Sequence, residues 1–132
     1  MPIRSDLRHF YTGPAWQAVR SRIRDRAADR CEHCQVPNHA RVYRRGGWWY
    51  DAILGQWRDW LGAPWAPGPP RHFRRRLVRI VCAVVHLNHT PGDDRDDNLR
   101  FLCQWCHLHY DAGKHRETRQ IRKDAARPLL VM

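Results

Sequence analysis

Apolar side chains recur at helical spacing near the N-terminus of the chain: Trp16, Val19, Ile23 and Ala27. Arginines fill most positions between them, so a helix over about residues 14–29 would bury the apolar stripe and expose charge. Pro14 suits the first helical position, because its missing N–H would have no intrahelical partner there. Residues 1–13 precede this helix and are interpreted as a loose leader.

A second apolar stretch is rich in β-branched residues: Val78, Ile80, Val81, Val84 and Val85. This composition predicts one buried strand over residues 77–87. Cys82 lies inside it with no neighbouring cysteine, which favours a buried structural thiol. A polar loop over residues 90–97 follows, and residues 98–102 are predicted to form a second short strand.

The C-terminal part of the chain is predicted to be helical. A cysteine-containing turn runs into a helix over residues 103–114, which Gly113 is expected to end. Residues 115–132 form a charged tail that is helical or frayed. With the two strands, this helix gives a core over residues 77–114 inside a single domain of 132 residues.

Residues 43–73 interrupt this pattern and are interpreted as an insertion that folds back on the domain. They contain most of the tryptophans: Trp48, Trp49, Trp57, Trp60 and Trp65. Dense proline and glycine oppose regular structure in the second half, and one short helix over residues 50–61 is expected before it. Four apolar residues of that helix are predicted to face inward: Ile53, Leu54, Trp57 and Leu61. The tryptophans could stack on bases, although packing is the favoured interpretation.

Net charge narrows the choice of partner. The chain has 24 Lys+Arg against 13 Asp+Glu, a formal charge of +11, and nearly all the basic residues are arginines. Arginine contacts phosphate in a bidentate manner, so a nucleic-acid partner is favoured, although a GC-rich genome would also favour arginine over lysine. The candidate phosphate contacts are Arg74, Arg75, Arg76, Arg79 and Arg100.

The sequence lacks the features of membrane or exported proteins. No apolar run approaches the roughly 20 residues that a membrane span needs, and the N-terminus has no apolar signal core. A cytosolic protein is therefore expected. In that compartment, five cysteines are more typical of metal ligands than of disulfides.

Four of the cysteines form two matched pairs, Cys31-x-x-Cys34 and Cys103-x-x-Cys106. Two intervening residues let both sulfurs of a pair turn onto one metal, and two such pairs make the tetrahedral thiolate site that zinc prefers. Because all four positions are cysteine, the site has no open coordination position and is expected to be structural. His33 and His107 lie beside the pairs and could compete as ligands, but four thiolates are sufficient.

Residues 84–111 place a histidine at a strand end, a polar loop, an Asn-Leu pair and a Cys-x-x-Cys-His turn that opens a helix. This order resembles the HNH endonuclease family, well over residues 31–34 and 77–111 and loosely over 14–30. The resemblance implies a small zinc-stabilised α+β domain with the ββα-metal fold, here with an N-terminal helix and a Trp/Pro-rich insertion. In that fold two antiparallel strands and a helix hold a catalytic divalent ion.

The resemblance also implies roles for individual residues. In the family the strand histidine is the general base, the asparagine orients it, and the third histidine binds the catalytic ion. These positions correspond to His86, Asn98 and His107. Asp111 lies four residues after His107 on the same helix face, so both can reach one ion. A carboxylate ligand there suits Mg²⁺ or Mn²⁺.

One position departs from the family pattern. A histidine or aspartate often stands directly before the base, whereas here that residue is Val85, which cannot bind metal. Asn88 or His89 is expected to supply the missing ligand. Alternatively, Asn88 and His89 are the ligand and the base, with His86 assisting them. The spacing to Asn98 favours His86, because a loop starting at His89 would be shorter than the family usually shows.

These features lead to one leading hypothesis and two alternatives. The first is a metal-dependent endonuclease, of phage or mobile origin, that nicks or cuts double-stranded DNA as a monomer or homodimer. Any sequence preference is expected to reside in residues 43–76. Deletion of the insertion is expected to alter DNA binding more than zinc content. The second hypothesis is a non-catalytic zinc module that binds nucleic acid, and a toxin-like nuclease ranks last.

Overall fold

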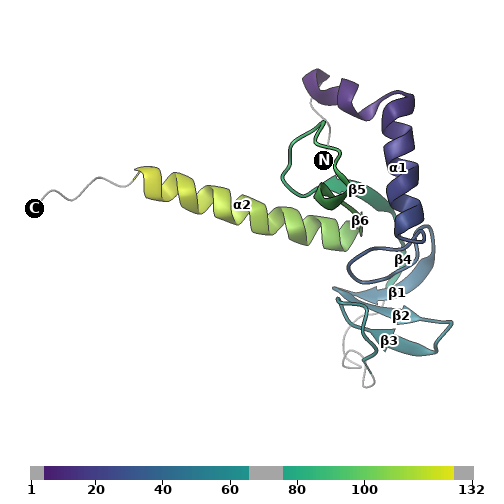
Figure 1. Cartoon of the computed structure of the whole chain (residues 1–132). Helices are drawn as coiled ribbons and strands as arrows, with labels where there is room; N and C mark the ends of the chain where they lie inside the picture. Colours follow the sequence, from purple (N-terminus) through teal and green to yellow (C-terminus); the bar gives the residue numbers. More distant parts are fainter. Residues whose placement is uncertain (1–4, 66–75, 127–132) are drawn as a thin grey trace, which may run out of the picture.

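A two-stranded antiparallel ribbon lies between the two long helices of the chain (Figure 1). The computed structural model describes residues 5–65 and 76–126. A second, four-stranded sheet lies beyond the ribbon, at the other end of the molecule from the N-terminal 3-10 helix. The elements run in the order η1 (Ser5–Tyr11), α1 (Pro14–Arg26), β1 (Arg41–Arg45), β2 (Trp48–Asp51), β3 (Gln56–Arg58), β4 (Arg76–Arg79), β5 (Cys82–His86), η2 (Asp96–Asn98), β6 (Leu99–Cys103) and α2 (Gln104–Ala126).

The ribbon β5–β6 is covered on both faces. On one face, the fully buried Ile23 of α1 packs against Leu99 and Phe101. On the other face, Val85 and Leu102 pack in a cluster with the cysteines and with side chains of α2. Residues that face each other across the ribbon share a side of it, so the strand alternation places Val84 and Phe101 toward α1 and places Leu102 toward α2.

The four-stranded sheet is antiparallel throughout, in the order β3-β2-β1-β4. Arg45 faces Trp48, so β1 and β2 are joined by a two-residue turn, Gly46-Gly47. Two-residue hairpin turns favour glycine because they need positive φ, and Gly46 has φ of 56°. Gly47 is required for space: a Cβ there would lie 2.6 Å from Cβ of Trp60. The two glycines therefore fix this hairpin against the rest of the domain.

The predicted helix over residues 50–61 is wrong, because this part of the chain forms the hairpin β2–β3. The carboxylate of Asp51 accepts the backbone N–H groups of Ile53 and Leu54, which closes the turn, and Gly55 follows with φ of 67°. Ile53, expected to face inward, is 83% exposed at the tip. The aromatic residues of β2 and β3, a type that favours strands, outweigh the apparent helical spacing.

The single strand predicted over residues 77–87 is also wrong, because it is divided into β4 and β5 in two different sheets. The break lies at Ile80 and Val81. Ile80 exchanges backbone hydrogen bonds with Ala40 and His39, and the N–H of Val81 donates to the side chain of Gln104. Both β4 and β5 contain β-branched residues, which favour a strand in each case. The sequence pattern therefore could not reveal that the two segments pair with different strands.

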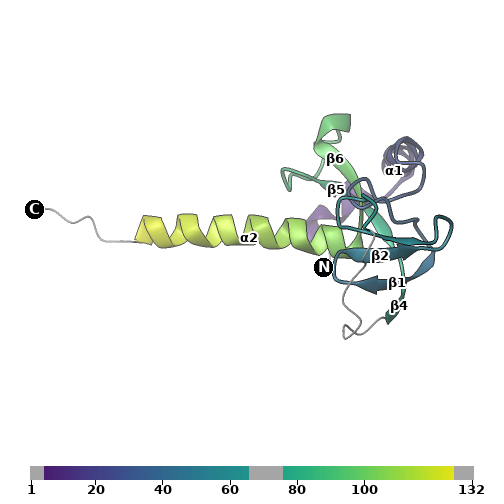
Figure 2. The ribbon, with the colours of Figure 1, turned by 90° about the horizontal axis from the view of Figure 1, so that it is seen from below.

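The C-terminal helix does not end near Gly113, and the prediction of a helical tail is confirmed as far as Ala126, whereas residues 127–132 lie outside the described residues. It continues through Gly113 to Ala126 and projects away from the rest of the domain (Figure 2). A glycine inside a helix costs about 1 kcal/mol relative to alanine, which a long helix tolerates. The loose leader is likewise corrected, since residues 5–11 form a 3-10 helix. The prediction of a helix starting at Pro14 is confirmed, as is the strand that begins near Asn98.

The described residues include no helix that is long and apolar enough to span a membrane.

The packing of α1 yields a stability prediction. Ile23→Ala should lower the free energy of unfolding by about 2–5 kcal/mol, because it opens a cavity in a fully buried site. Ile53→Ala is the matched control, since its side chain is 83% exposed, and should change it by less than about 0.5 kcal/mol. Urea denaturation of both variants measures the difference. Equal losses would contradict the packing described.

Candidate metal centre and histidine cluster

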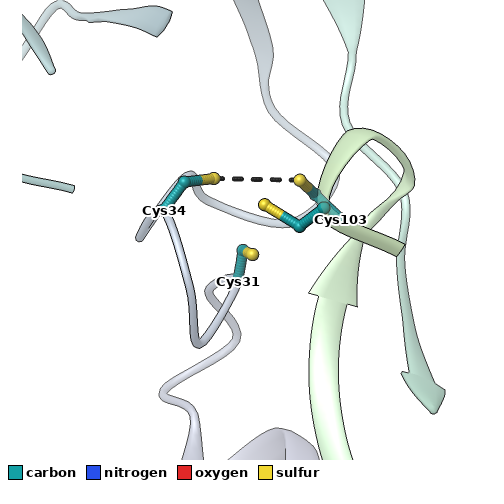
Figure 3. Close-up of side chains that lie close together, drawn as sticks. Cys31, Cys34 and Cys103 are labelled. Atoms are coloured by element: carbon teal, nitrogen blue, oxygen red, sulfur yellow. Dashed lines mark hydrogen bonds between the residues drawn. The ribbon is translucent and has the colours of Figure 1, made fainter. Parts of the chain in front are cut away.

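Four cysteine sulfurs converge at the junction of the two sheets (Figure 3). Cys31 and Cys34 come from the turn after α1, Cys103 ends β6, and Cys106 lies in the first turn of α2. All four are buried, and their Sγ atoms lie within 4.8 Å of one another, with 3.8 Å between Cys34 and Cys103. A tetrahedron of Zn–S bonds of about 2.3 Å has edges of about 3.8 Å, so these residues are positioned to hold a metal ion.

Local backbone bonds shape the first cysteine pair into a turn. The N–H of Cys31 donates to the carbonyl of Val36, and the N–H of Gln35 returns to the carbonyl of Cys31. Gln35 has φ of 67°, which reverses the chain after Cys34. The N–H of His33 points at Sγ of Cys31, 3.4 Å away. The turn therefore presents both sulfurs to the same point.

Arg44 is a buried cation that contacts the cysteine cluster directly. Its two terminal nitrogens donate to Sγ of Cys103 and of Cys34, both at 3.4 Å, and the side chain is only 6% exposed. The guanidinium also lies 5.8 Å from the ring centroid of Trp105. Burial opposes the charge on Arg44, but the two thiolates outweigh that effect and raise its pKa.

Contacts within the cluster favour the ionised form of Cys103, whereas hydrogen bonds with Cys103 raise the pKa of Cys34 and of Cys106. Hydrogen bonds from the thiols of Cys106, Cys31 and Cys34, aided by the charge of Arg44, lower the pKa of Cys103. Thiolates are the form that binds metal. Four thiolates around a divalent ion carry a net charge of −2, which is costly to bury, and Arg44 offsets half of it.

Part of the insertion therefore packs against the cysteine cluster, and the effect of its deletion on zinc content and on DNA binding stays a prediction. Arg44 lies on β1, and on β2 the indole N–H of Trp49 donates to the carbonyl of Cys34 at 2.8 Å. Trp49 is 1% exposed and belongs to the same buried cluster as the cysteines. No motif marks Arg44 in the sequence, because its contacts form only when β1 pairs with β4.

The other residues beside the cysteines have different roles. Cys82 pairs with Cys103 across the ribbon but lies outside the group of four, and burial raises its pKa. A structural thiol fits both observations. Nδ1 of His33 is 3.9 Å from Sγ of Cys106 but bonds the carbonyl of Trp60 at 2.7 Å, so His33 is engaged in joining the turn to the insertion.

Two histidines meet on one carboxylate at the other end of the ribbon. Nε2 of His89 lies 3.0 Å from Oδ1 of Asp111, and Nε2 of His107 lies 3.1 Å from Oδ2. The side chain of Asp111 is 9% exposed, whereas His89 and His107 are 42% and 37% exposed. The cluster is therefore anchored in the protein by its carboxylate and open to solvent at its imidazoles.

Two contacts bring His89 to helix α2. His89, three residues after the end of β5, adopts φ of 55°, and this left-handed conformation redirects the chain. The hydroxyl of Tyr110 donates to the carbonyl of Leu87, and its ring centroid is 5.6 Å from that of His89. The turn after β5 is thus held against α2, which carries His107 and Asp111.

The loop after His89 is cross-linked by its own polar side chains. The amide of Asn98 donates to Oδ1 of Asn88 and to the carbonyl of Asp93, and its oxygen accepts the N–H of Asn88. Asn88 in turn donates to the carboxylate of Asp93. Ion pairing with Arg95, helped by this bond from Asn88, lowers the pKa of Asp93 to about 2. Asn98 therefore shapes the loop from a buried position.

His86 lies on the opposite face of the ribbon. It pairs with Leu99 on the side that faces α1, and its ring stacks on Trp16 with centroids 5.6 Å apart. Nε2 lies 2.8 Å from Oδ1 of Asp94, and the residue is 5% exposed. Tyr11 contacts the same ring edge-on at 5.9 Å.

The predicted site residues thus fall into two groups. His107, Asp111 and His89 are together, whereas His86 is held separately by Asp94 and Trp16. The expected contact of Asn98 with the His86 ring is replaced by that of Asp94. The amide of Asn88, an expected ligand, is used within the loop. Asp94 had no distinguishing signal in the sequence, because it is one of four acidic residues in a polar loop.

The predicted phosphate contacts are dispersed. Arg76 and Arg79 are exposed on β4, and Arg100 is half-buried and donates to the carbonyl of Leu99. Arg74 and Arg75 lie outside the described residues.

Comparisons with protein-family models, with curated proteins and with solved structures found no match to this chain. The resemblance to the HNH family is therefore carried by the motif residues alone and stays a prediction.

The contacts of Arg44 give a test of the metal centre. Arg44→Gln should weaken Zn²⁺ binding about 10–100-fold, because it removes a charge and a bond to the ligand sulfurs. Arg45→Gln, one residue along and exposed, removes the same charge as the matched control. Competition with a chromophoric chelator measures both affinities. Equal affinities for the two variants would show that Arg44 does not support the thiolates.

Proposed function

We propose that this protein is a metal-dependent DNA endonuclease of the HNH type. The observation that carries the proposal is the meeting of His89 and His107 on the carboxylate of Asp111. The three residues come from the turn after β5 and from the helix after β6, as expected for a strand-strand-helix metal site. Few kinds of active site combine two histidines and a carboxylate with a neighbouring four-cysteine centre.

In this proposal the four cysteines hold a structural Zn²⁺. Zinc prefers four thiolates, and no position remains open for substrate. The centre ties α1, β6 and α2 to the four-stranded sheet, since its ligands and their partner Arg44 come from all these parts or their flanks. Its role is therefore to fix the relative positions of the elements that carry the histidines.

His89, His107 and Asp111 would hold the catalytic divalent ion, proposed to be Mg²⁺ or Mn²⁺. Bound there, such an ion would stabilise negative charge on the phosphate and the leaving oxygen. His89 then supplies the ligand that Val85 cannot, and its exposed imidazole faces solvent together with that of His107. Asp111 presents one oxygen to each histidine, so its carboxylate holds both imidazoles nearby. Ligand atoms of the three residues do not all lie within 4.8 Å of one another, so binding of an ion would draw the two rings together.

His86 is the proposed general base. In the tautomer that protonates Nε2, this nitrogen donates to Asp94 and leaves Nδ1 as the proton acceptor. Because the ring is 5% exposed on the α1 side of the ribbon, the proposal requires the stack with Trp16 to open before the attacking water reaches Nδ1. The carboxylate of Asp94 would stabilise the imidazolium that forms, as an aspartate does beside other catalytic histidines. Asn98 would act on His86 only indirectly: its amide donates to the carbonyl of Asp93 and so holds the loop that carries Asp94.

Charge supports double-stranded DNA as the substrate. The net charge of +11 attracts a polyanion, and phosphate contacts by exposed arginines such as Arg76 and Arg79 would add affinity regardless of sequence.

One observation favours a second candidate, a non-catalytic zinc module that binds nucleic acid. His86 is only 5% exposed and stacks on Trp16, which is how a histidine in a structural role is packed. In that case His86 would stabilise the contact of α1 with the ribbon and would not reach water.

Cleavage of supercoiled plasmid separates the two candidates. The native protein should nick or cut with Mg²⁺ or Mn²⁺, and His86→Ala should lower the rate about a hundredfold or more while Mn²⁺ binding persists. His89→Ala and His107→Ala should instead weaken Mn²⁺ binding, measured by electron paramagnetic resonance.

His109→Ala is the matched control for these variants. His109 is exposed on the same helix, and its Nδ1 bonds the carbonyl of Trp105 at 2.8 Å, outside the cluster. It should cleave as the native protein does. Cleavage that survives His86→Ala but not His89→Ala, with Mn²⁺ still bound, would move the base to His89. Absence of cleavage with either metal, beside tight DNA binding, would favour the non-catalytic module.

Removal of the proposed zinc gives an independent prediction. The purified protein should contain one zinc per chain, and a strong chelator should unfold it, because metal binding and folding are coupled in small domains. Acidification should also release the metal, since protons compete with it for the thiolates. Circular dichroism and elemental analysis measure both effects. A metal-free protein with an unchanged spectrum would refute the structural role.

A further inference from the structure

The outer face of the four-stranded sheet combines arginines with aromatic rings. The strand registers place one side of the sheet toward the cysteine centre, with Arg44, Trp49 and Asp51 among its buried residues. The alternate positions therefore face outward. They are Leu77 and Arg79 on β4, Arg41, Tyr43 and Arg45 on β1, Trp48 and Tyr50 on β2, and Trp57 on β3. We call these residues the outer sheet face.

Its exposure is unusual for such apolar side chains. Tyr43 is 49% exposed and Leu77 is 56% exposed, and these two residues face each other across β1 and β4. Trp48, Tyr50 and Trp57 are half-buried. Large exposed apolar side chains gathered on one sheet face are typical of an interaction surface.

The rings are held in place by their neighbours. Trp48 stacks on Trp65 with centroids 4.9 Å apart and planes 11° apart, and Tyr50 contacts Trp57 at 5.7 Å. Rings that are already ordered lose little conformational freedom when another flat group stacks on them. This surface therefore suits planar, aromatic ligands.

Charge on the same face selects the ligand. Arg41 lies directly opposite Arg79, an arrangement of like charges that destabilises a sheet. Within the part of the chain that the structure describes, neither guanidinium bonds a carboxylate. No outward position of β1 to β4, over the residues named above, is acidic. A bound polyanion would remove this repulsion.

We infer that the outer sheet face binds single-stranded DNA, with its bases stacked on the rings and its phosphates paired with Arg41 and Arg79. Bases in a duplex are already stacked, so only unpaired bases can use the rings. Four-stranded sheets with outward aromatic residues stack two or three bases in this way. The choice of DNA over RNA rests on the proposed function, whereas stacking and phosphate pairing rest on the face alone.

This surface gives the protein a second contact with nucleic acid. Its rings and arginines lie on the side of the sheet that faces away from the cysteine centre. The strand it holds would be separate from the residues proposed to catalyse cleavage, so binding can be measured without cleavage.

Fluorescence anisotropy with a labelled oligo-dT of about 12 nucleotides tests the inference, using the full zinc-loaded chain without added Mg²⁺ or Mn²⁺. Tyr43→Ala should weaken binding at least about fivefold, because a stacking surface is lost, and Tyr43→Phe should restore it. Ile53→Ala, which removes another exposed apolar side chain, is the control and should bind normally. Zinc content and circular dichroism confirm folding in each case.

The arginines are tested by the dependence of binding on salt. Arg41→Gln combined with Arg79→Gln should reduce the slope of log affinity against log salt by about 1.4, or about 0.7 for each lost phosphate contact on a single strand. Arg20→Gln with Arg24→Gln, two exposed arginines of α1, lowers the net charge equally and should leave the slope almost unchanged.

Three results would overturn the inference. Duplex DNA binding as tightly as oligo-dT, with Tyr43→Ala neutral for both, would show that the rings do not stack on bases. Equal salt-dependence slopes for the Arg41/Arg79 and the Arg20/Arg24 double variants would show that only the total charge of the protein affects binding. Tighter binding of oligo-rU would refute the choice of DNA. None of these depends on cleavage, so failure of the proposed nuclease activity would leave this result interpretable.

Discussion

The convergence of four cysteine sulfurs on one buried point is the constraint on which the rest of this structure depends. Cys31 and Cys103 are far apart in the sequence, yet their thiols share a cluster with the other two within 4.8 Å. Thiols packed so closely need a counter-charge, because their ionised forms repel one another. Arg44 supplies part of it from β1, and a bound metal ion would supply the rest. The insertion is thereby tied to the domain core.

The ribbon β5–β6 divides the candidate chemistry between its two faces. His86 faces α1 and is covered by Trp16, whereas Val85 faces the side on which α2 packs. The turn after β5 then carries His89 around to α2, where it meets Asp111 and His107. A shift of one residue in the register would exchange these faces, so the pairing of His86 with Leu99 decides which histidine reaches the helix.

The four-stranded sheet contributes residues both to the cysteine centre and to the proposed nucleic-acid surface. Its inner face supplies Arg44 and Trp49 to the cysteine centre, and its outer face presents Tyr43 and Arg41 to solvent. Successive residues of a strand point in opposite directions, so one short strand can stabilise a metal centre and bind a ligand at once.

Local patterns in the sequence determined the helix at Pro14, the strand over most of residues 98–102, and the four cysteines as one group positioned to hold a metal ion. The helix and the strand depend on residues that are neighbours in the chain, and the cysteine group depends on a ligand spacing that is typical of zinc sites. The pairing of His107 with Asp111 followed from helical spacing in the same way. The division of residues 77–87 between two sheets did not, because β-branched residues favour a strand without specifying its partner. Only the tertiary structure placed Arg44 at the sulfurs and separated His86 from His89, since both results depend on hydrogen bonds and registers between distant segments.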